Sequence, residues 1–319
     1  MSRARFRQLA PVIAYAATAC RPEIDDDASR VEGPRIIAVR AEPAEARPNE
    51  RVTLTALHTD GSEAVIDAPL AWSFCTSRRS LAEPDPVDPA CLSGAAATSI
   101  GSGVSVGATI PRDACRTFGP DRPLAKPGEP AGRPADPDGT GGFFQPGIVG
   151  GAGAPATMFE VRIRCGLASV PQQVSLELEQ RYLPNTNPEI DRIERLRGDA
   201  VEVLANGAEL RASIGEAVRL RVAWPDCAGL DPCHGAERYV SYDVGARALV
   251  DRRESVAVSW LTSAGSFAAP RTGVGENAAS TSTENVWTAP RSPTSGSLFV
   301  VLRDARGGVA FRVIAVRVD

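Results

Sequence analysis

Much of the chain alternates apolar and polar residues with a period of two, the pattern of strands that bury one face. The stretch 158–165 sets Phe159, Val161 and Ile163 against charged neighbours, and the same alternation recurs in 51–57, 173–180, 216–224 and 255–260. One-sided burial of this kind favours antiparallel sheets packed as a sandwich. Helical periodicity is confined to one short stretch at 188–196, so the sequence predicts an all-β fold.

The strand pattern occurs twice, in residues 33–183 and in residues 196–319, with a linker at 184–195 between them. Each repeat has six or seven predicted strands, turn signals between them, and a tryptophan in a central strand, Trp72 in the first and Trp260 in the second. This combination is typical of immunoglobulin-like sandwiches. An antibody-type pair of inter-sheet cysteines is not evident, so we expect only the architecture: two tandem immunoglobulin-like β-sandwich domains with long loop insertions.

Each predicted domain carries an insertion. The first, residues 119–156, contains ten glycines and eight prolines, too few apolar side chains to offset the entropy of ordering, and is expected to be a flexible loop. Phe143 and Phe144 lie within it and would contact either a partner or the sandwich itself. The second insertion covers 225–250. Because recognition residues concentrate on loops, these two segments are where we expect any binding site.

The amino terminus has the features of an export signal. A basic start, MSRARFR, is followed by an apolar stretch too short to span a bilayer, which ends in Ala17-Thr18-Ala19-Cys20. Small residues before a cysteine resemble the lipobox of bacterial lipoproteins, although that motif prefers leucine at the position of Ala17. The expected organisation is a signal peptide at 1–19, lipid attachment at Cys20 and a flexible tether at 20–33; ordinary cleavage after Ala19 is the alternative.

Six cysteines remain once Cys20 is set aside. An even number in an exported protein predicts three disulfides, and sequence proximity suggests Cys75–Cys91, Cys115–Cys165 and Cys227–Cys233. A zinc site is the rival for the last pair, with Cys227, Cys233, His234 and either Asp226 or Asp231 as ligands. An oxidising compartment favours the disulfide.

Charge argues against nucleic-acid binding. The chain has a net charge of −4. Without the first nineteen residues 32 basic residues face 39 acidic ones, near −7, whereas nucleic-acid binding requires a basic face.

The residue types give little support to catalysis. A catalytic triad would need His58 or His234, the two histidines of the chain; His58 is expected to be solvated beside a turn, and no G-x-S-x-G elbow occurs. Acids are spread along the whole chain, and Glu254 and Asp304 are interpreted as loop and turn residues. We therefore expect no enzyme activity, no catalytic residue, no metal and no cofactor, with a secreted hydrolase built on unidentified acids as an alternative.

Two binding hypotheses stay open. Asn185, Asn187, Glu189 and Asp191 in the linker could supply oxygen ligands to calcium, or could form a plain Asn-Pro turn. Trp287, whose strand phase the pattern does not fix, could present a sugar-binding face.

Three further stretches carry a resemblance. They resemble exported bacterial lipoproteins with immunoglobulin-like domains and no assigned activity. The stretches are PRIIAVRAEPAEARPNERVTLTAL, YLPNTNPEI and VSWLTSAGSF…TENVWTAP…FVVLRDARGG. The resemblance implies a lipid-anchored protein of the outer membrane or cell surface, acting as a non-catalytic binding or structural module. The expected partners are the membrane, through the anchor, and an envelope protein or polysaccharide; a carbohydrate-binding or adhesion role is the alternative.

Overall fold

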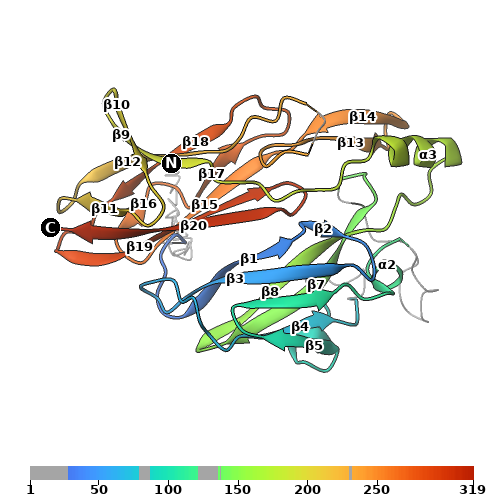
Figure 1. Ribbon diagram of the computed structural model, residues 1–319, viewed down its shortest axis with the longest axis horizontal. Coiled ribbons are helices and arrows are strands. Elements are labelled where there is room, and N and C mark those ends of the chain that lie inside the picture. Colours follow the sequence, from blue (N-terminus) through green and yellow to red (C-terminus); the bar gives the residue numbers. More distant parts are fainter. Residues whose placement is uncertain (1–27, 79–86, 121–135, 137, 230–231) are drawn as a thin grey trace, which may run out of the picture.

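The computed structural model describes residues 28–78, 87–120, 136, 138–229 and 232–319. The predicted signal peptide, 1–19, and Cys20 lie outside these ranges. Within them the chain forms two β-sandwich domains packed side by side (Figure 1). No helix in the described part of the chain is long and apolar enough to cross a membrane.

The first domain consists of a three-stranded and a five-stranded sheet, in the orders β1-β3-β6 and β2-β8-β7-β4-β5. The strands are β1 (Arg35–Glu42), β2 (Glu45–Ala46), β3 (Arg51–Thr59), β4 (Ala71–Cys75), β5 (Ala97–Ser102), β6 (Ser105–Thr109), β7 (Gly142–Gly151) and β8 (Ala154–Arg164). Two short helices, α1 (Pro89–Leu92) and α2 (Ala114–Thr117), lie in the connections, and α3 (Gln172–Arg181) follows the last strand.

The second domain consists of two five-stranded sheets, in the orders β10-β9-β12-β18-β16 and β11-β20-β19-β15-β17. Its strands are β9 (Arg192–Arg197), β10 (Ala200–Leu204), β11 (Glu209–Ala212), β12 (Ala217–Ala223), β15 (Val256–Thr262), β16 (Ser266–Phe267), β17 (Arg271–Val274), β18 (Ser282–Thr288), β19 (Thr294–Asp304) and β20 (Val309–Val318). A separate hairpin, β13 (Arg238–Asp243) and β14 (Ala248–Arg253), stands between β12 and β15.

The tryptophan-bearing sheets of the two domains have corresponding strand orders, β2-β8-β7-β4-β5 and β11-β20-β19-β15-β17. In each, a short strand pairs in parallel with the last strand, β2 with β8 and β11 with β20, while the other strand pairs are antiparallel. Trp72 on β4 and Trp260 on β15 occupy the same place in the two sandwiches and are fully buried. This is the immunoglobulin-like arrangement, in which a central strand places its tryptophan between the sheets.

Four segments differ from the sequence prediction. Residues 173–180, expected to be a strand, belong to α3. Residues 142–151, expected to be part of a flexible loop, form β7, which pairs with both β4 and β8. The insertion 225–250 contains the β13–β14 hairpin rather than loop alone, and β9 begins at Arg192, within the expected linker.

The domains share an apolar interface. Val31, Ala38 and Leu57 of the first domain pack with Phe299 and Val301 of the second, whose side chains are 0% exposed. The outer face of β1 and β3 thus lies against β19 and β20 (Figure 1). Because this contact buries large apolar side chains, the tandem is one packed unit and not two domains on a flexible linker.

The segment expected to be the end of a tether is also part of this unit. The Val31 N–H donates to the Thr262 carbonyl at 2.8 Å, and the Thr262 N–H donates to the Ser29 carbonyl at 2.8 Å. Val31 is 2% exposed. Residues 29–31 therefore pair with the end of β15 in the second domain, so this part of the expected tether 20–33 is ordered structure.

Candidate functional site

The two insertions meet at a groove of about 1200 Å³, which we call the insertion groove. Asp136, Asp138 and Gly139 line it from the first insertion, Tyr239 and Tyr242 from the β13–β14 hairpin, and residues 167–171 from the approach to α3. Small-molecule ligands are usually bound in concave sites of this kind, where an apolar lining carries a few fixed polar groups.

A backbone contact joins the two insertions. The Tyr242 N–H donates to the Gly139 carbonyl at 2.7 Å. Gly139 has φ +68°, and a Cβ at this position would lie 2.5 Å from the Tyr242 carbonyl oxygen. Glycine is therefore required twice over, by the left-handed backbone and by the close approach of the hairpin.

The turn at 136–141 is organised by its two acids. The Asp136 carboxylate accepts from the N–H groups of Gly139 at 2.9 Å and Gly141 at 2.7 Å, and Asp138 accepts from the Thr140 hydroxyl at 2.6 Å. Burial, followed by the charge of Asp138, raises the pKa of Asp136 to about 6. These acids shape the wall of the groove.

A buried arginine supports the same turn from beneath. Arg162 on β8 is 1% exposed. Its guanidinium contacts Asp138 at 2.8 Å, Glu45 at 2.7 Å and the Thr140 hydroxyl at 2.5 Å. Because two carboxylates and a hydroxyl surround it, the desolvated cation is compensated and can fix the turn in place.

The facing wall carries a second ion network. Arg252 on β14 donates to Glu276 at 2.9 Å, to the Ser241 hydroxyl at 2.8 Å and to Asp243 at 3.3 Å. Tyr239 lies beside Glu276, and burial together with that carboxylate raises its pKa to about 12. The wall therefore presents the neutral Tyr239 phenol and a paired guanidinium at ordinary pH.

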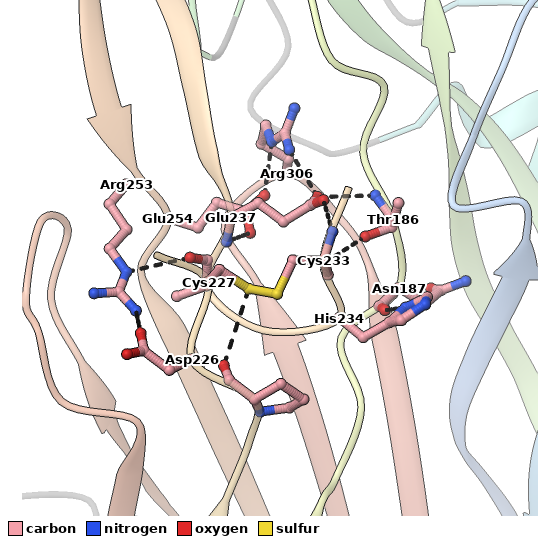
Figure 2. Close-up of a disulfide and its surroundings, with 12 residues drawn as sticks. Thr186, Asn187, Asp226, Cys227, Cys233, His234, Glu237, Arg253, Glu254 and Arg306 are labelled. Carbon is pink, nitrogen blue, oxygen red and sulfur yellow. Dashed lines mark hydrogen bonds and ion pairs between the residues drawn. A yellow bond between two sulfur atoms is a disulfide. The ribbon is translucent and has the colours of Figure 1, made fainter. Parts of the chain in front are cut away.

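The third polar cluster lies where the domains join, next to the disulfide in Figure 2. Arg306, 1% exposed, donates to Glu254 at 2.6 Å and to Glu237 at 2.9 Å, and Glu237 also accepts from the Thr186 N–H at 3.0 Å. Asp304 is also buried and accepts from the Gly308 N–H at 2.8 Å. We call Arg306, Glu237, Glu254 and Asp304 the junction cluster.

The junction cluster contains three carboxylates and one guanidinium. Burial is the main cause that raises the pKa of Glu254, to about 8, and the charges of Asp304 and Glu237 act in the same direction against Arg306. Burial also raises the pKa of Asp304. Glu254 therefore retains its proton at neutral pH, which leaves less negative charge buried around Arg306.

The six cysteines are paired as proximity suggests, in Cys75–Cys91, Cys115–Cys165 and Cys227–Cys233. Cys227 and Cys233 therefore do not ligate zinc as thiolates. Asp226 forms an ion pair with Arg253 at 3.0 Å, and the His234 ring lies 2.9 Å from the Asn187 carbonyl oxygen (Figure 2). Asp231, the other acid considered for zinc, lies outside the described residues. Three disulfides indicate an extracytoplasmic location.

The suggested calcium ligands do not converge. Asn185 donates to Asp304 at 3.4 Å, Asn187 donates to the Ala41 carbonyl at 2.7 Å, and Asp191 is paired with Arg192. Among the described residues, no group of three or more His, Cys, Asp or Glu side chains forms a metal-ligating cluster. The two asparagines instead connect the linker to both domains.

Other predicted positions are resolved by burial. Trp287 is 0% exposed and donates to the Ala264 carbonyl at 2.9 Å, so it is a core residue and no sugar platform. Phe143 is 3% exposed and packs into the first sandwich, as the local contact hypothesis has it. His58 is 3% exposed, which corrects the expectation of a solvated side chain, and burial lowers its pKa.

Sequence reasoning missed the polar residues that matter most here. Arg162 lies on the polar phase of its strand, yet the turn at 136–141 and Glu45 cover it. Glu254 and Asp304, expected in exposed loops and turns, are buried in the junction cluster. Period-two alternation indicates on which face of the sheet a side chain lies. It does not indicate whether another part of the chain packs over that face and buries the side chain.

Comparisons with known proteins show no family: no family model matches the chain, and no curated protein matches it in sequence. Among solved structures it is similar to dimeric latent PorU from Porphyromonas gingivalis, with 10% identity over 91% of this chain and 24% of that one, at a TM-score of 0.21. It is also similar to the adhesin InvE from Yersinia pseudotuberculosis, with 11% identity over 88% of this chain and 58% of that one, at 0.21.

A third match is the C-terminal domain of the Streptococcus pyogenes antigen I/II-family protein AspA, with 8% identity over 90% of this chain and 100% of that one, at a TM-score of 0.20. The chain thus spans about a quarter of the PorU chain and a little over half of the InvE chain. Similarity at this level carries no argument about function, and the sandwich assignment rests on the strand order given above.

Proposed function

We propose that the protein is a lipid-anchored, non-catalytic binding module of the bacterial cell envelope, with the insertion groove as its recognition site. The observation that carries this proposal is the contact between Tyr242 and Gly139, because it builds one groove from the insertions of two different domains. Two immunoglobulin-like sandwiches packed as one unit supply the rigid scaffold on which such a site keeps its shape.

The state of the acids in the groove supports binding rather than hydrolysis. The carboxylates of Asp136 and Asp138 accept hydrogen bonds from their own turn, and those of Asp243 and Glu276 accept from Arg252. A general acid and base must be able to exchange protons with a substrate, whereas these groups are engaged in holding backbone and ion pairs.

The lining favours an envelope polysaccharide as the ligand. Tyr242 supplies ring surface, Val244 is 78% exposed at the hairpin tip, and the Arg252–Glu276 pair offers both donors and acceptors to hydroxyl groups. Tyr242 therefore takes the place of Trp287 as the aromatic group that an adhesion or carbohydrate-binding role would use.

The groove is tested with Tyr242→Ala in a binding assay against purified envelope polysaccharides. We expect at least a tenfold loss of affinity. The matched control is Val201→Ser on β10, which is 53% exposed at the opposite end of the second domain (Figure 1). Equal binding by Tyr242→Ala and the wild type would contradict the assignment of the groove, and release of reducing ends by the wild type would revive the hydrolase alternative.

The anchor is tested separately with Cys20→Ala. If Cys20 is acylated, this change moves the protein from the membrane fraction to the soluble fraction and abolishes incorporation of labelled palmitate. A variant that stays with the membrane and incorporates as much label as the wild type would contradict the lipid anchor at Cys20 and leave the groove proposal unaffected.

A further inference from the structure

A second cavity lies between the domains, away from the insertion groove. It has a volume of about 390 Å³, and we call it the junction crevice. Its wall is assembled from separate parts of the chain: Arg40 on β1, Asn187 in the linker, Asn206 between β10 and β11, His234 in the second insertion, and Arg312 on β20. A volume near the lower end of the range for small-molecule sites, about 300–1000 Å³, suits a ligand the size of one sugar residue.

The crevice is more basic than acidic. Arg40 and Arg312 come from different domains, and Glu189 is the one carboxylate among the described residues that line the cavity. The Arg40 guanidinium donates to Glu42 at 2.7 Å through one nitrogen, while its buried Nε has no hydrogen-bond partner. Donor capacity on this side chain is therefore left unused.

Arg312, which is partly buried, lacks the carboxylate partners that Arg162 and Arg306 have. In the described part of the chain it forms no ion pair, and its guanidinium donates a 2.7 Å hydrogen bond to the Ile190 carbonyl. Burial lowers the pKa of its guanidinium, although Glu189 and Asp191 act in the opposite direction. Arg162 and Arg306, by contrast, each touch two carboxylates.

A half-buried guanidinium that no carboxylate contacts directly is a costly arrangement, and an anion with two or more oxygens reduces that cost by bidentate hydrogen bonding. His234 contributes a further polar group, because one ring nitrogen faces the Asn187 carbonyl at 2.9 Å and the other is left for a ligand. Asn206 is exposed at the rim, where its amide can contact ligand hydroxyls.

We propose that the junction crevice binds a small organic oxyanion, a carboxylate or phosphate group on a ligand about the size of one sugar, held between Arg40 of the first domain and Arg312 of the second. The site does not share residues with the insertion groove, so it is independent of the proposed recognition function. Since the two arginines belong to different domains, the bound anion would also connect the domains.

The test is isothermal titration calorimetry of the purified chain with sodium phosphate, sodium glucuronate and, as a neutral sugar of similar size, glucose. We expect saturable binding of at least one of the two anions and none of glucose. Stronger binding of glucuronate assigns the site to a carboxylate, and stronger binding of phosphate assigns it to a phosphate.

Two variants and a matched control keep the result interpretable. Arg312→Gln and Arg40→Gln should each weaken anion binding at least tenfold. Arg219→Gln, which removes the same charge from a 55% exposed side chain on β12, should leave it unchanged. Arg40 is only partly buried, so its variant is expected to fold even if Arg312→Gln does not. The proposal is overturned if neither anion binds saturably, or if both crevice variants bind as the wild type does.

Discussion

The guanidinium of Arg306, between β19 and β20, lies 2.6 Å from the Glu254 carboxylate, which precedes β15. Both side chains are 0% exposed. The pair joins two connections of the second domain, and Arg306 also donates to the Leu183 carbonyl in the chain that leaves the first domain, at 3.1 Å. This one side chain thus connects the linker to the body of the second domain.

Removing Arg306 should destabilise the whole protein. In Arg306→Met the side-chain volume is kept, but Glu237 loses its buried ion-pair partner and Glu254 loses a hydrogen-bond donor. Breaking a buried ion pair from one side typically costs about 3–5 kcal/mol. The measurement is urea unfolding, with Arg317→Met as control, since Arg317 is 54% exposed at the carboxyl end of β20 and should change stability by less than about 0.5 kcal/mol. Equal effects of the two changes would show that the junction cluster contributes little.

Stability should fall as pH rises through neutrality because of Glu254. The pKa of this group is about 8 in the folded protein against 4.5 when unfolded. The folded state therefore binds the extra proton between these values, and the free energy of unfolding decreases with pH by up to about 1.4 kcal/mol per pH unit for one proton. The contribution is fully present below pH 4.5 and is lost above about pH 8.

The appropriate measurement compares wild type with Glu254→Gln at several pH values from 5 to 9. Other groups, such as Asp136 with its raised pKa and His58 with its lowered one, titrate in both proteins and cancel in the difference. The wild type should lose stability relative to the variant up to about pH 8 and not beyond. If the free energies of unfolding of the two proteins change in parallel with pH, Glu254 is not the group that binds the extra proton in the folded state.

The disulfides should differ in their effect according to the length of chain that they close. Cys115–Cys165 spans 50 residues and Cys227–Cys233 spans 6. Loop-closure entropy gives about 4 kcal/mol for the first and about 2 kcal/mol for the second. Double cysteine-to-alanine variants of each pair, compared by denaturant unfolding, should show the larger loss for Cys115–Cys165. The reverse order would indicate that local contacts around Cys227–Cys233 dominate.

Gly139→Ala should disrupt the insertion groove. The added methyl group would meet the Tyr242 carbonyl oxygen at 2.5 Å, in addition to the strain of a positive φ. Gly207→Ala is the matched control, because Gly207 also has a positive φ, +77°, but a Cβ there meets nothing within 4 Å. The control should cost about 1–2 kcal/mol for the backbone alone. A larger loss in Gly139→Ala, with faster amide exchange at Tyr242, would isolate the clash; equal losses would show that the hairpin moves away freely.

The interface between the domains can be tested at Phe299. In Phe299→Ala a fully buried ring is removed from the shared apolar cluster. We expect a loss of about 3–5 kcal/mol and, because this side chain lies between domains, separation of one unfolding transition into two. A single transition at lower denaturant would mean that the domains are coupled through the linker contacts instead.

The sandwiches themselves could be predicted because alternation reports one-sided burial directly. Trp72 and Trp260 fall on the inward phase of their strands and are both fully buried. In 173–180 the same alternation was misleading: Val174, Leu176 and Leu178 suggest a strand, but the stretch is rich in Gln, Glu and Leu, which favour helices. In α3 only Leu178 is buried, while Leu176 is 52% exposed.

The strand β7 shows why composition alone fails. Its glycines predict disorder, yet backbone pairing with β4 and β8 needs no side chains. At Gly147 a Cβ would lie 2.3 Å from the Phe159 ring, so the absence of a side chain is what allows that ring to pack over the strand. Such a requirement depends on a residue twelve positions away and is not visible in local sequence.

The candidate sites could be anticipated only in outline. The expectation that the insertions 119–156 and 225–250 carry any recognition site rests on their predicted loop character and stays a prediction. That they come from different domains and meet at Gly139 and Tyr242 depends on how the domains pack. The junction crevice depends on the same packing, because Arg40 and Arg312 are 272 positions apart in the sequence printed above.

The pairing of residues 29–31 with Thr262 determines how mechanical load enters the molecule. A pull on the amino-terminal segment reaches the end of β15, in the later of the two domains, before it reaches β1. The force is then shared across the apolar face between the domains, and two hydrogen bonds to Thr262 must break before the first domain bears it alone. Under tension the two sandwiches would therefore be drawn along together instead of being peeled apart.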